Sequence, residues 1–288
     1  MGLEFGILFA AFSAMILWAV GDFLIQKSTR KVGDLEALAF IGIIGTLGLI
    51  PFMIKDFDKL FSVSNLILLL VLGIVSFVAA LFDLEALRIA KLSTTDIIIE
   101  LELPITILMG YFFFKEGLSI MQFVITSFIF VGILLVATES FSHWKLKWER
   151  GILLAFLAAV GMGLINFLTS ASSRDISPIM AVWAPWFILT VFCLVLIYKR
   201  GDFPKFAKNA SKFKWLLLSM GIIDTAAWVF YSFAVFNENI GLITAITESY
   251  PAVALFLGVW LNKEKINWHQ YLGAALAIVS SIALAAFL

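Results

Sequence analysis

Seven acidic residues fall inside, or near the ends of, long apolar stretches of this chain, where a charged side chain is costly. They are Asp22, Asp83, Glu85, Glu100, Glu102, Asp224 and Glu248. An ionised acid at the centre of a membrane costs about 2.5–3.5 kcal/mol, so it must be protonated, hydrated in a cavity or paired with a cation. Only Arg88, three residues beyond Glu85, lies close enough in sequence to neutralise any of the seven. These acids are therefore candidates for binding a cation or a proton.

Depth within the apolar stretches ranks the candidates. Asp224 lies ten residues beyond Lys214, which is about 15 Å along a helix and close to the middle of a membrane. Glu100 and Glu248 are similarly deep within their own stretches. We predict that Glu100, Asp224 and Glu248 bind the substrate or a proton. Asp224, which has no cation nearby in the sequence, is the candidate proton carrier.

Four further polar residues rank lower: Glu102, Asp83, Asp22 and Asn166. Asp22 and Asp83 lie closer to the ends of their stretches, where hydrated or paired acids are common. Glu102 points about 200° away from Glu100 on a helix, so both face one cavity only if the nearby proline distorts the turn. Asn166 could bind substrate or could equally hydrogen-bond to a neighbouring helix.

Aromatic residues accompany one of the acids. Asp224, Trp228 and Tyr231 follow at i, i+4 and i+7, so they share one helix face. A carboxylate beside aromatic rings suits an ammonium group through cation–π contact. Rings of this kind also form belts at the membrane surface, but Trp228 lies too deep for a belt. We predict that Trp228 and Tyr231 line a binding cavity. Five other rings could line it or serve equally well in packing: Trp18, Trp183, Trp186, Tyr111 and Tyr250.

The composition indicates where these residues are held. The chain has 288 residues, of which 62% are hydrophobic and 14% charged, against about 45–50% and about 25% in soluble domains. About 20 apolar residues in a helix cross the hydrocarbon core. Ten such stretches occur, at approximately 5–25, 35–54, 65–87, 95–114, 119–138, 151–171, 178–198, 215–236, 241–261 and 269–288. The fold class expected is an all-α integral membrane protein with about ten transmembrane helices.

Charge and cysteine content exclude several other functions. Twenty basic residues balance twenty acidic ones, so no nucleic-acid partner is expected. Cys193 is the single cysteine and the two histidines fall in connecting segments, so we expect no internal disulfide, no metal site and no cofactor. The expected partners are the lipid bilayer, a small-molecule substrate and, if the acids titrate, protons. The oligomeric state stays open.

The two halves of the chain resemble each other. Shifted by 145 residues, GILFAAFSA at 6–14 lies on GILLAFLAA at 151–159, with five of nine residues identical. Shifted by 148 residues, the fourth and fifth stretches lie on the ninth and tenth. This register pairs Glu100 with Glu248, Gly110 with Gly258, Lys115 with Lys263, Glu116 with Glu264 and Gln122 with Gln270. Five helices in each half is an odd number, so the second half must enter the membrane from the opposite side, as in many secondary transporters. We predict inverted repeats at 1–140 and 149–288.

The paired segments ELELPITILMGYFFFKEGLSIMQF and TESYPAVALFLGVWLNKEKINWHQYLGAALAIVSSIALA carry a family resemblance. They are similar to the EamA-type branch of the drug/metabolite transporter superfamily, although this chain has Lys-Glu at 115–116 and 263–264 where many relatives have Gly-Glu. The resemblance covers the whole chain. It implies export or exchange of amino acids, metabolites or cationic drugs through a central cavity formed by the first four helices of each half.

The basic residues predict the orientation in a cell membrane. Sixteen of the twenty lie on connections at one face: Lys27, Arg30, Lys31, Arg88, Lys91, Lys145, Lys147, Arg150, Lys199, Arg200, Lys205, Lys208, Lys212, Lys214, Lys263 and Lys265. The other face has only Lys55, Lys59, Lys115 and Arg174. The positive-inside rule makes the first face cytoplasmic and leaves both termini outside. The segment 204–214, with Lys and Phe on opposite sides, suits a short helix on the anionic inner leaflet.

Together these features favour a non-enzymatic secondary transporter of a small cationic or zwitterionic metabolite such as an amino acid or amine. It would be an exporter or exchanger, and proton coupling and exchange of one substrate for another are both open. A multidrug cation exporter is the alternative closest to it. Alternatives of another class are a receptor or scramblase that transports nothing, and an intramembrane aspartyl protease, because two acids at depth could activate water. The protease's GxGD pattern is missing from the sequence.

Overall fold

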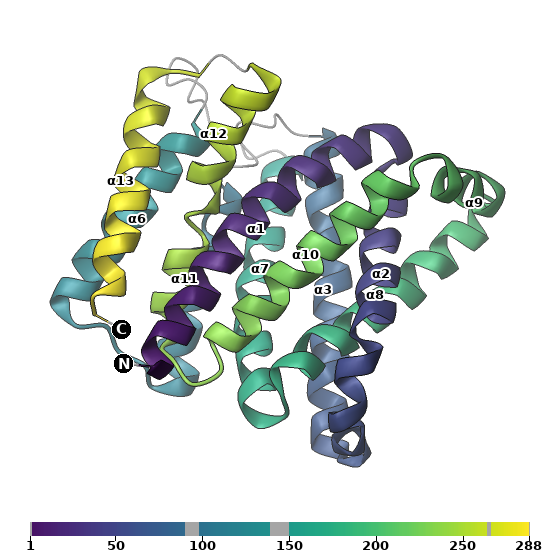
Figure 1. Ribbon diagram of the computed structural model, residues 1–288, viewed down its shortest axis with the longest axis horizontal. Coiled ribbons are helices and arrows are strands. Elements are labelled where there is room, and N and C mark those ends of the chain that lie inside the picture. Colours follow the sequence, from purple (N-terminus) through teal and green to yellow (C-terminus); the bar gives the residue numbers. More distant parts are fainter. Residues whose placement is uncertain (1, 90–97, 139–149, 264–265, 288) are drawn as a thin grey trace.

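The computed structural model describes residues 2–89, 98–138, 150–263 and 266–287, and all its regular elements are helices. The first half contains α1 (Gly2–Val32), α2 (Asp34–Met53), η1 (Ile54–Phe61), α3 (Val63–Ile89), α5 (Glu102–Met109), η2 (Gly110–Phe114) and α6 (Ile120–Ala137). The second contains α7 (Arg150–Asp175), α8 (Pro178–Lys199), α9 (Phe203–Lys212), α10 (Lys214–Ala234), α11 (Ile240–Thr247), α12 (Tyr250–Asn262) and α13 (Trp268–Ala285). Figure 1 shows them as one bundle of tilted helices.

The predicted transmembrane architecture is confirmed. Within the described residues, nine helical segments are long and apolar enough to cross a membrane. The shorter apolar helix Glu102–Phe114, formed by α5 and η2, supplies the remaining span. Several predicted basic residues, namely Lys91, Lys145, Lys147 and Lys265, lie outside the described residues, as do Glu264 and the side chain of Arg88.

The 148-residue register appears in the local structure of both halves. Lys115 and Lys263 end the fourth and ninth spans in the left-handed conformation, with φ of 61° and 55°. The next helix then starts with a capping box, formed by Ser119 and Gln122 in the first repeat and by Asn267 and Gln270 in the second. Such a box satisfies backbone N–H groups at the helix start. Gln122 and Gln270 are thus paired because each completes the capping box of the last helix of its repeat, α6 or α13.

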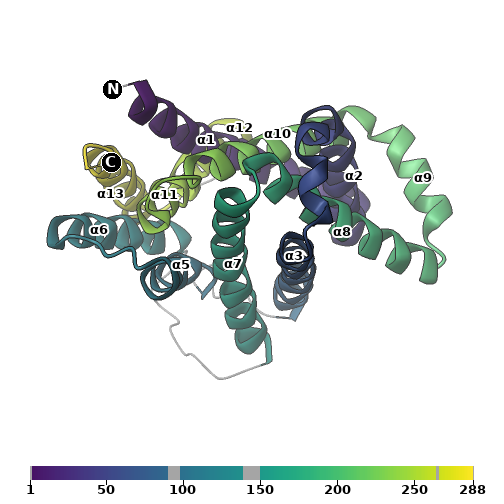
Figure 2. The same cartoon turned by 90° about the horizontal axis from the view of Figure 1, so that it is seen from below.

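The helices pack across the repeats rather than within them. Helix α1 lies along α10 and α3 along α7, while α2 packs on α8 and α6 on α13 (Figures 1 and 2). Gly73 of α3 lies so close to Ile188 of α8 that a Cβ has no room, and Gly221 of α10 lies equally close to Ile44 of α2. These reciprocal contacts are those of two inverted repeats related by a pseudo-twofold axis. The axis passes where α2 meets α8 and α6 meets α13.

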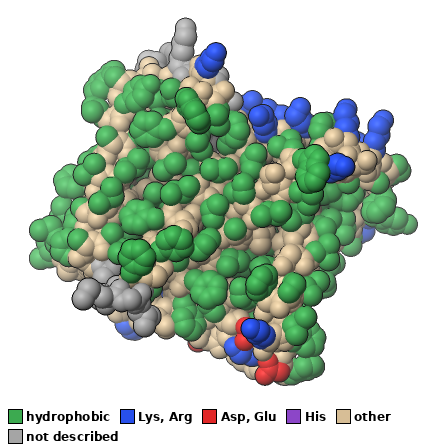
Figure 3. Space-filling model, in the orientation of Figure 1, with side chains coloured by type: hydrophobic (Ala, Val, Ile, Leu, Met, Phe, Trp, Pro, Cys, Tyr) green, Lys and Arg blue, Asp and Glu red, His purple; other side chains and the backbone are tan. Residues whose placement is uncertain are grey.

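The bundle has two chemically different ends. Both chain termini lie toward one end, which we call the terminal end, and η1 is also there. The opposite end carries α9 and the last turn of α1, and we call it the basic end. Figure 3 shows Lys and Arg side chains gathered along its rim. Arg30 and Lys31 in the last turn of α1, and Lys208 and Lys212 on α9, are exposed there.

Helix α9 is fixed to the basic end by one buried acid and one ring stack. The Glu36 carboxylate accepts a hydrogen bond from Asn209 Nδ2 at 2.7 Å. It also forms an ion pair with Lys205 Nζ at 2.9 Å. Phe206 stacks on Phe40 with ring centroids 4.4 Å apart. The amphipathic helix expected at 204–214 therefore forms, with Phe206 buried and one of its lysines used to neutralise Glu36.

Candidate transport site

The fourth and ninth spans are both broken near the middle of the bundle. In the fourth span Glu100 and Leu101 form a turn before α5 begins at Glu102. In the ninth span Glu248 and Ser249 separate α11 from α12 (Figure 1). A proline lies just beyond each break and cannot donate a backbone hydrogen bond. Broken helices that meet between inverted repeats are the usual setting of a transporter's binding site.

Side-chain hydroxyl groups satisfy part of the backbone freed by the breaks. Ser249 Oγ donates to the carbonyl of Ala245 at 3.1 Å and lies 2.6 Å from Ser281 Oγ on α13. Thr106 Oγ1 donates to the carbonyl of Glu102 at 2.9 Å. Asn166 of α7 in turn donates to Thr106 Oγ1 at 3.3 Å, so this secondary candidate joins α7 to the broken span. These bonds stabilise the chain on either side of the breaks.

Two carboxyl groups meet at the breaks, one from each repeat. Glu102 and Glu248 are only 8% and 4% exposed, and their side chains lie within hydrogen-bonding reach of each other. Glu100 and Asp22 lie near enough to act electrostatically on Glu248, and Asp83 acts on Glu102. In the described part of the chain, neither Glu102 nor Glu248 forms an ion pair with Lys or Arg. The site therefore concentrates acidic groups.

An aromatic cluster of Trp18, Trp228, Tyr231 and Tyr250 lies beside these acids. The Trp18 ring centroid is 5.1 Å from that of Trp228, 5.3 Å from Tyr231 and 6.1 Å from Tyr250. Tyr231 is fully buried, and its hydroxyl oxygen lies 2.9 Å from Thr244 Oγ1. Glu248 acts electrostatically on both tyrosines. Rings and carboxylates thus surround the same central region, contributed by α1, α10 and α12.

Asp224 occupies a neighbouring position on α10. It is 7% exposed and lies next to Gly21 of α1, with Asp22 acting on it electrostatically. Trp228 and Tyr231, one and two turns further along α10, belong to the aromatic cluster. Asp83, half-buried on α3, has a carboxylate oxygen with no hydrogen-bond partner among the described residues. The acids thus extend from the Glu102–Glu248 pair along α1, α3 and α10.

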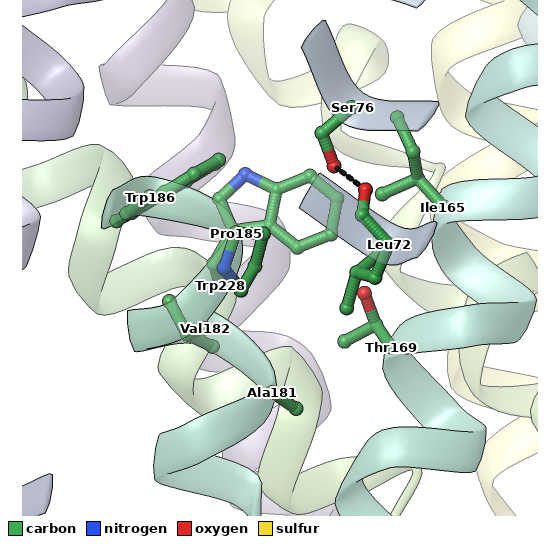
Figure 4. A pocket seen from close by; sticks show the side chains of 9 residues that line it. All are labelled: Leu72, Ser76, Ile165, Thr169, Ala181, Val182, Pro185, Trp186 and Trp228. Carbon is green, nitrogen blue, oxygen red and sulfur yellow. Dashed lines mark hydrogen bonds between the residues drawn. The ribbon is translucent and has the colours of Figure 1, made fainter. Parts of the chain in front are cut away.

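A small cavity lies next to Trp228, between α3, α7, α8 and α10. Its volume is about 10 Å³, which is room for about one water molecule. In Figure 4 the Trp228 indole stands between Trp186 on one side and Ile165 and Thr169 on the other, with Ser76 donating to the Leu72 carbonyl nearby. A metabolite has no room there unless α10 or its neighbours move.

Sequence reasoning and structure differ most over Glu102. A helical wheel directs Glu102 away from Glu100, but the turn at Glu100 and Leu101 interrupts the helix, and both residues act on Glu248. The structure also places Trp18 against Trp228, Tyr231 and Tyr250. The 148-residue register was the available signal, because it pairs Glu102 with Tyr250 and Glu100 with Glu248. It puts all four residues at the two breaks.

Comparison with known proteins identifies the family. A solved structure titled only "Crystal structure of protein" superposes with a TM-score of 0.80 over 98% of this chain and 96% of that chain, at 15% sequence identity, which shows a shared fold. No curated protein matches the chain. The family model described as the EamA-like transporter family matches twice, at residues 4–138 and 149–286. The chain therefore belongs to the EamA-like transporter family of the drug/metabolite transporter superfamily, a family of membrane transporters whose two repeats it carries in tandem.

Proposed function

We propose that this protein is a secondary transporter that exchanges protons for a small cationic or zwitterionic metabolite, with an amino acid or an amine as the first candidate. The observation that carries the proposal is the Glu102–Glu248 pair. The two carboxyl groups lie buried against each other where the broken spans of both repeats meet. The proposed proton coupling and the cationic nature of the substrate both follow from what such a pair can bind.

Two carboxyl groups that share a hydrogen bond must hold a proton between them, because a carboxylate has no donor of its own. A substrate cation arriving at the pair offers N–H donors and positive charge, and so replaces that proton. Proton and substrate then compete for the same oxygens, which couples the movement of one to the movement of the other. Inverted repeats supply the motion, since the two halves can exchange conformations around a fixed central site.

The aromatic cluster favours an ammonium group over a metal ion as the cation. Glu102 and Glu248 act electrostatically on Tyr231 and Tyr250, and the Trp18 ring lies against both tyrosines. A cation over such a ring gains about 0.5–2 kcal/mol, most when it is desolvated. Tyr231 keeps its hydroxyl bonded to Thr244, so its ring is held in a fixed orientation.

Uptake into proteoliposomes tests the proposal. Purified protein is assayed with a panel of labelled amino acids and amines, with and without a pH gradient. We expect at least one substrate to accumulate only with the gradient. Glu248→Gln and Glu102→Gln each remove the shared acid and should reduce gradient-driven accumulation about tenfold or more, because coupling requires a titratable group.

Matched variants separate coupling from folding. Asp58→Asn removes an exposed acid of η1 outside the spans and should leave accumulation unchanged. Asp224→Asn tests the proton carrier expected from the sequence: loss of accumulation with substrate exchange retained would assign coupling to Asp224 as well. Undiminished gradient-driven uptake by both glutamate variants, normalised to folded protein, would refute the carboxyl pair as the coupling site.

A further inference from the structure

Arg174, the last basic residue of α7, joins three segments at the terminal end. Its Nε donates to the carbonyl of Val235 at 3.1 Å, and one Nη donates to the carbonyl of Glu238, both in the connection between α10 and α11. The other Nη forms an ion pair with the Glu116 carboxylate, which follows η2. The guanidinium also lies over the Phe114 ring, 4.2 Å from its centroid. All three nitrogens and one face of the cation therefore have partners.

Glu116 completes the connection between the repeats. Its second carboxylate oxygen accepts a hydrogen bond from the backbone N–H of Ile240 at 2.7 Å, at the start of α11. The side chains of Arg174 and Glu116 are 22% and 19% exposed, so the pair is largely shielded from solvent. A single ion pair thus links the fourth span, α7 and the ninth span, all of which meet again at the carboxyl pair deeper in the bundle.

Serine hydroxyl groups join the same helices close to this ion pair. Ser170 donates to the same Val235 carbonyl at 3.3 Å. Ser173 Oγ lies 2.6 Å from Ser232 Oγ, and Ser232 donates to the carbonyl of Pro178 at 2.8 Å. The preceding residue of α10, Tyr231, has its hydroxyl oxygen 2.9 Å from Thr244 Oγ1 of α11. These contacts hold α7, α10 and α11 against one another at the terminal end.

We propose that Glu116, the Phe114 ring and the carbonyls of Val235 and Glu238 form a cation-binding site, which Arg174 fills to keep the terminal end closed and which a guanidinium or ammonium substrate takes over as that end opens. The identity of the substrate as a cation rests on the proposed function. The site and the closure rest only on the contacts of Arg174.

The chemistry of the site explains why it should accept a second cation. A guanidinium has five N–H donors and a flat face, and this site offers a carboxylate, two carbonyls and a ring in matching positions. If Arg174 swings out, Glu116 is left with a largely buried, unneutralised charge, which is costly. An arriving cation removes that cost, so a free guanidinium or ammonium ion can occupy the site whenever Arg174 has left it.

Cysteine labelling tests the closure. In a Cys193→Ser background, Ser232→Cys places a thiol one turn below the Val235 carbonyl, where the serine is fully buried. We expect Arg174→Ala to speed its reaction with a water-soluble maleimide about tenfold or more, because loss of a shielded ion pair shifts the closed–open equilibrium by at least that order. Glu116→Gln, which keeps Arg174, should act in the same direction. Lys55→Ala removes an exposed cation at the same end and should have no effect.

Methylguanidinium tests the binding site. Added to the Arg174→Ala protein, it should slow labelling back toward the parental rate, and in Arg174→Ala with Glu116→Gln it should have no effect. Parental labelling rates in both single variants would overturn the closure, and equal slowing with and without Glu116 would overturn the site. Labelling requires no transport, so these results stand even if gradient-driven uptake fails and the proton-coupling proposal is lost.

Discussion

Acidic residues have different partners at the two ends of the bundle and at its centre. Near the basic end, buried Glu36 is neutralised by Lys205 and hydrogen-bonded by Asn209. At the terminal end Asp56 is paired with Lys59. Glu102 instead lies against a second carboxyl group. An acid with a fixed cation stabilises the fold, whereas an acid facing another acid stays available for a proton or a substrate, which is the basis of the proposed coupling.

Asp56 gives a pH-dependent stability prediction. Burial alone would raise its pKa, but hydrogen bonds from Lys59 and Ser177 and the charges of Lys59 and Lys55 together hold the pKa below its ordinary value of 3.8. Its contribution to stability is therefore complete above pH 3.8 and is lost as the pH falls below that value. We expect Asp56→Asn to lower the free energy of unfolding by about 1 kcal/mol or less at neutral pH. Thermal unfolding should show the difference shrinking in acid; a constant difference down to pH 3 would contradict this.

At the scale of helices, apolar length and small-residue patterns carry most of the information. The boundaries of α6, α8 and α13 fall close to those expected, because a span needs about 20 apolar residues and ends at a charge or a cap. The breaks at Glu100 and Glu248 could not be predicted with the same certainty. A proline in a membrane helix often causes only a kink, and whether the chain breaks depends on neighbours such as Ser281 that satisfy the freed groups.

The α6–α13 contact gives a packing prediction. A Cβ at Gly132 would lie 2.7 Å from the Gly273 carbonyl oxygen, between two backbones that cannot both shift. We expect Gly132→Ala to destabilise the protein by about 1–3 kcal/mol. Gly48→Ala is the matched control, because Gly48 has open space around it and alanine favours a helix. Thermal unfolding in detergent compares them, and a Gly132→Ala protein as stable as the control would show that the two helices can separate freely.

For the whole molecule, the odd number of spans in each half predicted the inverted repeats, which the family match and the reciprocal helix pairs confirm. What the sequence could not supply is contact between residues far apart in the chain. Arg174 and Glu116 are 58 residues apart, and Glu102 and Glu248 belong to different repeats. Spacing along one helix says nothing about such pairs, because they form only when α7, α10 and the broken spans come together.

The last prediction is that the terminal end faces outward. Sixteen basic residues were expected on one face and four on the other, and the described ones at the basic end include Lys31, Lys208 and Lys212. Each Lys or Arg near an anionic inner leaflet contributes about 1 kcal/mol, so an excess of this size should decide the orientation.

Labelling of intact cells tests this orientation. In a Cys193→Ser background, a cysteine replacing exposed Lys55 on η1 should react with a membrane-impermeant maleimide. A cysteine replacing exposed Lys208 on α9 should react only after the cells are permeabilised. The two variants lose one positive charge each, one from either face, so the charge bias is nearly the same in both. Labelling of the Lys208 position alone in intact cells would reverse the orientation, and the Arg174–Glu116 ion pair would then close the cytoplasmic side of the path.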